Sequence, residues 1–205
     1  MDTTTVAAFL AVDLLLVFTP GADWAYAISA GLRDRSVVPA VTGLIAGYVG
    51  YTLLAAVGLV AIVASSATVL TTLTISGAVY LMWLGWGVLR RPAALGASTE
   101  PMATSRGQIM LKGAGISGLN PKALLLYFSL FPQFVHPADG WPVAAQTGLL
   151  SALHMTACGV VYLSVGVLAR TVLRTRPSAA RAVTRASGAM MIVIGGFLLA
   201  ERLAV

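Results

Sequence analysis

The chain has 205 residues, of which 58% are hydrophobic and only 10% charged, and its mean hydropathy is +0.89. A soluble domain carries about 25% charged residues, so this composition excludes a sizeable soluble domain and predicts an all-α integral membrane protein. The net charge of +6 does not indicate a nucleic-acid partner, because the arginines lie in loops between apolar runs, where they orient the chain and contact lipid. The single cysteine excludes an internal disulfide bond.

Six apolar runs predict six transmembrane helices, since a span needs about 20 apolar residues. No basic residue precedes the first run, which argues against a cleaved signal peptide. We expect a single transporter domain over 1–205, with one repeat at about 1–91, a loop at about 92–112 and a second repeat at about 113–205. The expected spans are 6–32, 37–63, 73–89, 113–134, 142–169 and 186–200, and the link at 64–72 is short and uncharged.

Prolines interrupt the first and fourth runs, at Thr19-Pro20-Gly21 and at Asn120-Pro121-Lys122. A proline inside a helix removes a hydrogen bond and frees the carbonyl group four residues earlier. Irregular backbone and ionisable groups at membrane depth usually line a cavity or a substrate path. We therefore predict that helices 1 and 4 are broken at Pro20 and Pro121, and that the two breaks face each other.

The two halves of the chain repeat each other. Thr42-Gly43-Leu44 matches Thr147-Gly148-Leu149, and Ser76-Gly77-Ala78 matches Ser187-Gly188-Ala189, in the same order as the two proline breaks. Each half has three spans, an odd number, so the halves must have opposite orientations. Inverted repeats with interrupted helices at matching positions are typical of secondary transporters. We therefore predict two inverted three-helix repeats.

The basic residues set the expected orientation. Eleven of the thirteen lie in the loops between spans 1 and 2, 3 and 4, and 5 and 6. Loops rich in lysine and arginine stay in the cytoplasm. The sequence therefore predicts a multi-pass protein with cytoplasmic basic loops and both termini outside.

These residues resemble the LysE/RhtB family of bacterial amino-acid exporters over essentially the whole chain. The resemblance is carried by Thr19-Pro20-Gly21 with Asp23, by the glycines of the second run, by Gly77-Ala78-Val79-Tyr80-Leu81 with Gly85, and by Asn120-Pro121-Lys122 through Phe131-Pro132-Gln133-Phe134. It implies a bacterial inner-membrane exporter of amino acids or close derivatives, driven by proton exchange, without fixing the substrate. The family usually has Pro-Gly-Pro in the first span. Here Ala22 replaces the second proline, so we expect a softer break.

The two breaks together provide ligands for an amino-acid zwitterion. A broken helix presents free N–H groups, which attract a carboxylate, and free carbonyl groups, which attract an ammonium. We expect Lys122 and the N–H groups after Gly21 to hold the substrate carboxylate. We expect Asp23 and the freed carbonyl groups of Leu16 and Ser117 to hold its amino group. The expected substrate-binding residues are thus Pro20, Gly21, Asp23, Asn120, Pro121 and Lys122. In the alternative interpretation, Lys122 forms a salt bridge with Asp23 that only stabilises the bundle, or Asp23 only caps the half-helix that follows the break.

The sequence offers three candidates for proton coupling: Asp13, Asp23 and His154. Asp13 lies seven residues before Pro20 and so shares its helix face, although it is not part of the family's pattern. In the alternative interpretation, Asp13 is hydrated near the outer interface. For His154, a satisfied interior histidine is the alternative to a titrating group.

Other functions remain as alternatives. An exporter of a metal cation or another small solute would need clustered Cys, His or carboxylate ligands, and those in the spans are scattered, so we expect no metal site and no cofactor. The chain has no HExxH, GxSxG or nucleotide-binding loop, so we expect no catalytic residues. Channel function is a further alternative to carrier function. The Gly43-x-x-x-Gly47 pair is compatible with a homodimer as well as with packing inside one chain. The scarcity of acids in the spans favours a neutral amino acid over a cationic one.

Overall fold

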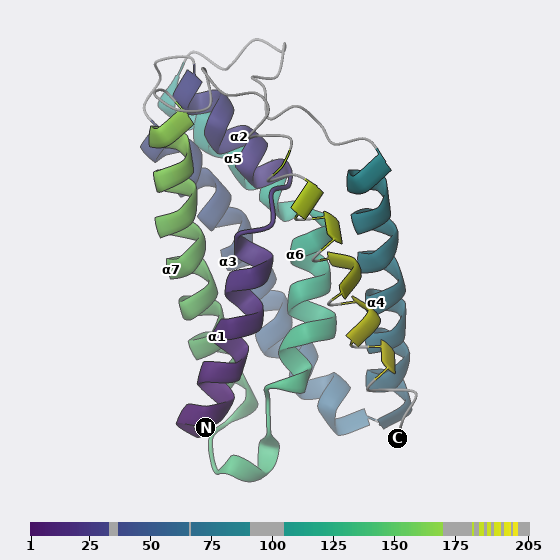
Figure 1. The fold of residues 1–205 in the computed structure, drawn as a ribbon. Helices are drawn as coiled ribbons and strands as arrows, with labels where there is room; N and C mark the ends of the chain where they lie inside the picture. Colours follow the sequence, from purple (N-terminus) through teal and green to yellow (C-terminus); the bar gives the residue numbers. More distant parts are fainter. Residues whose placement is uncertain are drawn as a thin grey trace.

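The computed structural model describes residues 1–32, 37–65, 67–90 and 105–169, together with scattered residues between 182 and 200. All regular secondary structure in these residues is helical (Figure 1). The basic segments at 33–35 and 170–181, the loop segment at 92–104 and the Glu201/Arg202 pair lie outside the described residues, as does part of the predicted sixth span.

The first half of the chain forms four helices. They are α1 (Thr3–Val17), α2 (Ala22–Leu32), α3 (Val37–Ser65) and α4 (Ala67–Arg90). The predicted first span, 6–32, corresponds to α1 and α2, which are bent by 57° relative to each other. The predicted link at 64–72 is helical wherever it is described, because this uncharged stretch has neither glycine nor proline to end a helix.

The second half begins earlier than predicted. Its elements are α5 (Arg106–Gly118), α6 (Pro121–Leu125), the π-helix η1 (Leu126–Leu130), the 3₁₀ helices η2 (Phe131–Gln133) and η3 (Pro137–Asp139), and α7 (Val143–Leu168). The predicted loop at 92–112 is wrong at its end, because α5 starts at Arg106. A capping box explains this start: the Gln108 N–H donates to the Ser105 hydroxyl (3.2 Å), and the Ser105 N–H donates to the Gln108 side chain (3.4 Å).

The two broken helices run in opposite directions, so α2 and α5 lie at one end of the bundle and α1 and α6 at the other (Figure 1). Helix α3 packs mainly against α5 and α7, and α2 packs against α7. Glycine makes the α3–α5 contact close: a Cβ atom on Gly43 would overlap the carbonyl oxygen of Met110, and one on Gly47 would lie 2.7 Å from that of Ala114. The Gly43/Gly47 pair therefore serves packing within the chain.

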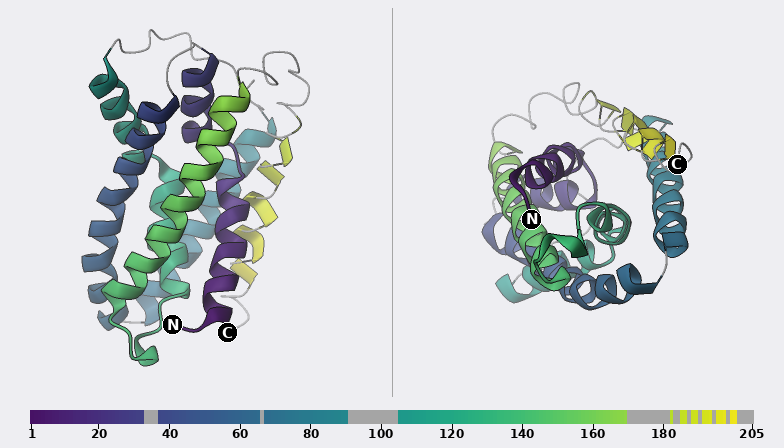
Figure 2. Two further views of the ribbon diagram at one scale, coloured as in Figure 1. Left: turned by 90° about the vertical axis from the view of Figure 1, so that its left-hand side faces the viewer. Right: turned by 90° about the horizontal axis from the view of Figure 1, so that it is seen from below.

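Helix α4 lies at the side of the bundle, next to the described residues of 182–200 (Figure 2). This contact also depends on small residues. A Cβ atom on Gly195 would lie 2.7 Å from the Ala78 carbonyl oxygen, and one on Gly188 would lie 2.8 Å from that of Gly85. Small residues of this kind let membrane helices approach closely.

Apolar side chains cover the outside of the bundle, while many of the buried side chains are polar. Two described helical segments are long and apolar enough to cross a membrane, Val37–Gly58 and Val143–Leu168, and the bent α1/α2 pair passes the same test as a unit. The exposed apolar side chains include Leu53, Val57, Trp83 and Leu111. The buried polar ones include Asp13, Asp23, Ser117, Asn120 and His154. Polar groups inside and apolar groups outside are the expected arrangement for a protein in lipid.

Candidate functional site

The first break separates α1 from α2 at residues 18–21. Several donors satisfy the carbonyl groups left free at the end of α1. The Trp24 indole N–H reaches back from α2 to the Val17 carbonyl oxygen (2.9 Å), and the Thr19 hydroxyl donates to that of Leu15 (2.8 Å). Trp24 therefore fixes the angle between the two half-helices.

The second break lies just before Pro121. Helix α5 ends at Gly118, and Pro121 is the first residue of α6, where its missing N–H leaves no helical bond unmade. The Asn120 side-chain oxygen caps α6 by accepting from the Lys122 N–H (3.0 Å). The Asn120 N–H donates to the Ser117 carbonyl oxygen (3.0 Å). This carbonyl group, expected to be free, therefore already has a partner.

Asp23, in the first turn of α2, is the centre of a buried hydrogen-bond network. Its Oδ2 atom accepts from the Tyr48 hydroxyl (2.5 Å), the Asn120 side-chain amide (2.9 Å) and the Tyr162 hydroxyl (3.4 Å). Its Oδ1 atom accepts from the Ser117 hydroxyl (3.2 Å). These donors come from α3, α5, α7 and the second break. The described donors to Asp23 thus all lie outside its own helix.

Lys122, in the first turn of α6, reaches in the opposite direction. Its ammonium group donates to the main-chain carbonyl oxygens of Leu16 (3.1 Å) and Thr19 (2.9 Å), both at the first break. A Cβ atom on Gly21 would lie 3.8 Å from Nζ, so the ammonium group lies against the bare backbone of that glycine.

The two breaks are therefore joined reciprocally. The acid that follows the first break binds side chains of the second, and the base that follows the second break binds carbonyl groups of the first. No oxygen of the Asp23 carboxylate lies within 4.0 Å of Lys122 Nζ, so these two described residues do not form the salt bridge of the alternative interpretation. The Asp23 carboxylate and the Lys122 ammonium group are therefore not paired with each other, although both lie at the helix breaks.

Asp13 and His154 form a second buried polar cluster. Asp13 is fully buried on α1, so the alternative that it is hydrated at the interface is wrong. Its Oδ1 atom lies 2.7 Å from Nδ1 of His154 on α7. Its Oδ2 atom has no hydrogen-bond partner among the described residues. The Cys158 thiol lies 3.5 Å from Nε2 of His154.

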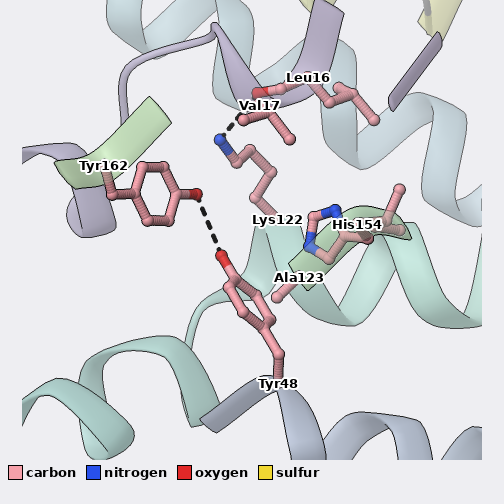
Figure 3. A pocket seen from close by; sticks show the side chains of 8 residues that line it. Leu16, Val17, Tyr48, Lys122, Ala123, His154 and Tyr162 are labelled. Atoms are coloured by element: carbon pink, nitrogen blue, oxygen red, sulfur yellow. Dashed lines mark hydrogen bonds between the residues drawn. The ribbon is translucent and has the colours of Figure 1, made fainter. Parts of the chain in front are cut away.

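A cavity of about 10 Å³ lies between the two polar clusters (Figure 3). This volume holds about one water molecule. Its lining includes Tyr48 and Tyr162, which donate to Asp23, together with Lys122, and His154 from the second cluster; the remaining lining residues are Leu16, Val17, Ala123 and Leu126. The cavity therefore connects the side chains expected to bind substrate with one expected to carry protons.

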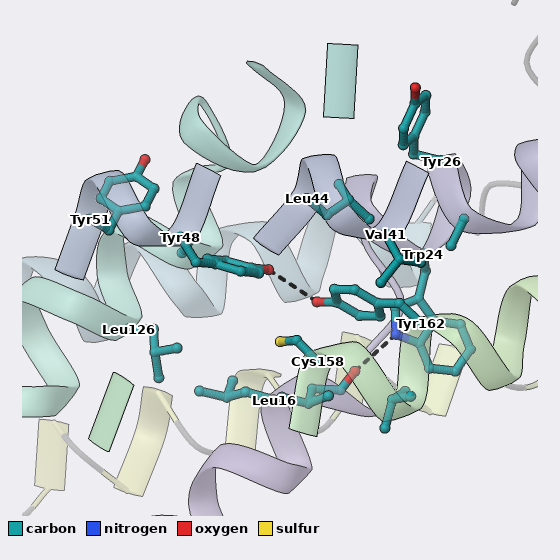
Figure 4. Packing of buried hydrophobic residues seen from close by; sticks show 14 of the residues in the cluster. Leu16, Trp24, Tyr26, Val41, Leu44, Tyr48, Tyr51, Leu126, Cys158 and Tyr162 are labelled. Carbon is teal, nitrogen blue, oxygen red and sulfur yellow. Dashed lines mark hydrogen bonds between the residues drawn. The ribbon is translucent and has the colours of Figure 1, made fainter. Parts of the chain in front are cut away.

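From the sequence, aromatic packing is the favoured role of each tyrosine in the spans, with a hydroxyl group directed into the cavity as the alternative. Tyr48 and Tyr162 donate to Asp23, and their hydroxyl oxygens lie 3.1 Å from each other (Figure 4). A signal existed on α7, because His154, Cys158 and Tyr162 recur every four residues and so share one helix face. A buried carboxylate also needs donors, and tyrosine hydroxyls are among the few that these apolar spans contain.

No group of three or more His, Cys, Asp or Glu side chains is placed to hold a metal ion in the part of the chain that the structure describes. The site instead offers one carboxylate, one ammonium group and several hydroxyl groups, a set suited to a small zwitterion.

The sequence profile of the LysE type translocators matches residues 14–202. The chain belongs to this family. The match includes both helix breaks and all the site residues described above except Asp13. No solved structure gives a significant match.

Several bacterial membrane and efflux proteins are similar to the chain. An uncharacterized membrane protein of Vibrio cholerae is 34% identical over 152 residues, which are 73% of this chain and 74% of the relative. A homoserine/homoserine lactone efflux protein of Salmonella typhimurium is 27% identical over 199 residues, 95% of this chain and 96% of the relative. A leucine efflux protein of Enterobacter sp. is 28% identical over 159 residues, 73% of this chain and 71% of the relative.

Proposed function

We propose that the protein is a secondary active exporter of amino acids or close derivatives, working by proton antiport across the bacterial inner membrane. The observation that carries the proposal is the reciprocal joining of the two helix breaks by Asp23 and Lys122. Relatives named as efflux proteins for homoserine and leucine, both of which are zwitterions, support the substrate class.

In this proposal the substrate amino group binds between Asp23 and the carbonyl groups at the end of α1. The Oδ1 atom of Asp23 accepts only from the Ser117 hydroxyl among the described residues, at 3.2 Å. A carboxylate oxygen can accept more than one hydrogen bond. Asp23 therefore keeps acceptor capacity for an ammonium group.

The substrate carboxylate binds at Lys122 and at the start of α2. The first N–H groups of α2 have no partner within the helix, and its dipole places positive charge there. Lys122 Nζ lies beside Gly21, directly before this end. Pro20 and Pro121 prevent regular helical hydrogen bonding at the two breaks. The Asn120 side-chain amide of the second break donates a hydrogen bond to Asp23.

Proton coupling is assigned to Asp13, Asp23 and His154. The 2.7 Å contact between Asp13 and His154 can hold or release a proton, and the cavity joins His154 to Lys122. Asp13→Asn is expected to abolish proton-driven transport while amino-acid counterflow, which needs no proton, continues. Unchanged proton-driven transport in Asp13→Asn would remove Asp13 from the mechanism.

The deciding experiment is transport in proteoliposomes. The vesicles are loaded with a mixed amino-acid pool, an inward proton gradient is imposed, and the species that leave are identified. Loss of one or a few amino acids, abolished by a protonophore and by Asp23→Ala, supports the proposal. Retention of every amino acid by folded protein points to another solute on the same fold.

The proposed architecture has six spans in two inverted repeats, with basic loops in the cytoplasm and both termini outside. The opposite directions of the two broken helices support it (Figure 1). In a Cys158→Ala background, the variant Thr4→Cys should react with an impermeant thiol reagent added to intact cells, and Arg176→Cys should react only after the cells are opened. The reverse pattern would invert the assigned orientation.

A further inference from the structure

The Lys122 ammonium group is bound without a carboxylate. Its two acceptors are the main-chain carbonyl oxygens of Leu16 and Thr19. Leu16 lies in the last turn of α1, where the helix dipole places negative charge. Neutral oxygens and a half-helix dipole therefore hold this positive charge at the break.

Carbonyl oxygens at the end of an interrupted half-helix are ligands that membrane transporters use for small cations. A primary ammonium group carries the same single charge and donates to the same oxygens. In this chain such a group is already present on the side chain of Lys122. The break thus contains a cation site that is filled by the ammonium group of Lys122, a side chain of the protein itself.

We propose that the carbonyl oxygens of Leu16 and Thr19 form an ammonium subsite, which Lys122 occupies when no substrate is bound and the substrate amino group takes over on binding. The inference rests on the proposed function for the identity of that substrate. The subsite itself, which binds primary ammonium groups, is a property of the helix break.

A small cavity beside Lys122 can receive its ammonium group when the substrate displaces it. The cavity of about 10 Å³ is lined by both Leu16 and Lys122, and Tyr48 and Tyr162 form another part of its wall (Figure 3). The lysine side chain has four methylene groups and many rotamers. Its ammonium group can therefore leave the carbonyl oxygens by a change of rotamer.

The exchange of one ammonium group for another limits the substrate class. A displaced Lys122 would be a buried charge without a partner, which is strongly unfavourable. The carboxylate of an amino acid supplies that partner, whereas an amino-acid amide or ester does not. The subsite therefore selects zwitterions over amines that lack a carboxylate.

The first test measures ammonium binding to the emptied subsite. The variant Lys122→Met keeps the apolar stem and removes the charge. Methylammonium chloride should raise the melting temperature of the purified variant by several degrees in a saturable way. Tetramethylammonium chloride at the same ionic strength, which cannot donate a hydrogen bond, should not. The wild-type protein should respond to neither salt.

Lys112→Met is the matched control, because it removes the other lysine of the chain, seven residues before the second break. It should behave as the wild type does. A Lys122→Met protein that responds to methylammonium no more than Lys112→Met would overturn the inference. This readout needs no transport, so it separates failure of the subsite from failure of the proposed function.

A wild-type measurement decides the matter if the Lys122 variant does not fold. The transported amino acid and its amide are compared as ligands of the same protein. The amide should bind at least 10-fold more weakly, because it leaves the displaced Lys122 unpaired. Equal affinities would show that Lys122 does not need the substrate carboxylate and would overturn the exchange.

Discussion

Asp13 and His154 are 141 residues apart in the sequence, yet Oδ1 of Asp13 lies 2.7 Å from Nδ1 of His154 in the interior of the bundle. They join α1 to α7, and so the first half of the chain to the second. Such a pair influences both proton movement and stability, because each partner would otherwise be a buried polar group without its main contact.

The Asp13–His154 contact should appear as a coupling energy. Removing one partner of a buried pair costs about 3–5 kcal/mol, so Asp13→Ala and His154→Ala should each lower the free energy of unfolding strongly. The double variant should lose clearly less than the sum of the two. Thr156→Ala, at an exposed position of α7, is the control and should be additive with Asp13→Ala. Additivity between Asp13 and His154 would contradict the contact.

The two tyrosines at Asp23 should differ in importance. The Tyr48 hydroxyl is 2.5 Å from Asp23 Oδ2, and that of Tyr162 is 3.4 Å away. A hydrogen bond to a charged group is worth about 1.5–3 kcal/mol, so Tyr48→Phe should reduce transport by about 10-fold or more. Tyr162→Phe should have a smaller effect, measured in the same vesicle assay.

Tyr80→Phe is the control for these variants, because Tyr80 lies on α4 beside Trp83 and is not among the described donors to Asp23. Its transport rate should equal that of the wild type. If Tyr162→Phe proved more damaging than Tyr48→Phe, the assignment of the main donor would be wrong.

The indole N–H of Trp24 should stabilise the bend between α1 and α2. Trp24→Phe keeps an aromatic ring but removes the donor to the Val17 carbonyl oxygen. A lost hydrogen bond of this kind costs about 1 kcal/mol, so the melting temperature should fall measurably. Trp83→Phe changes an exposed ring and should leave the melting temperature unchanged. Equal effects of both substitutions would argue against the contact.

Gly43 and Gly50 lie on the same helix and should respond differently to an added methyl group. A Cβ atom on Gly43 would overlap the Met110 carbonyl oxygen of α5, whereas one on Gly50 has no neighbour within 4 Å. Gly43→Ala should lower the free energy of unfolding by about 1–3 kcal/mol through overpacking. Gly50→Ala should be neutral or stabilising by up to about 1 kcal/mol, since alanine favours the helix. A tolerated Gly43→Ala would contradict the close α3–α5 contact.

The sequence predicted the family and the helical membrane class, because hydrophobic composition and proline-centred motifs are local signals. It also singled out Asp23 and Lys122, since ionisable groups are rare in apolar spans. The partners of these two residues were not predictable in the same way. Whether Lys122 binds a carboxylate or main-chain carbonyl groups depends on how α1 and α6 pack, and side-chain spacing within one span carries no information about that.

The start of α5 shows the same limit at a helix end. Residues 106–112 begin and end with a basic side chain, so composition placed them in a loop. The capping box formed by Ser105 and Gln108 begins the helix there instead. The sequence likewise could not predict that Asp13 is buried, because its hydrogen-bond partner, His154, lies in the other half of the chain.

The cavity at the breaks has room for about one water molecule, which is too little for any amino acid. Helices that line it must therefore separate before a substrate can bind. In such a protein the measured affinity is the intrinsic affinity multiplied by the fraction of molecules that are open. A substitution that loosens the bundle far from Asp23 and Lys122 can thus tighten apparent substrate binding without altering a single ligand contact.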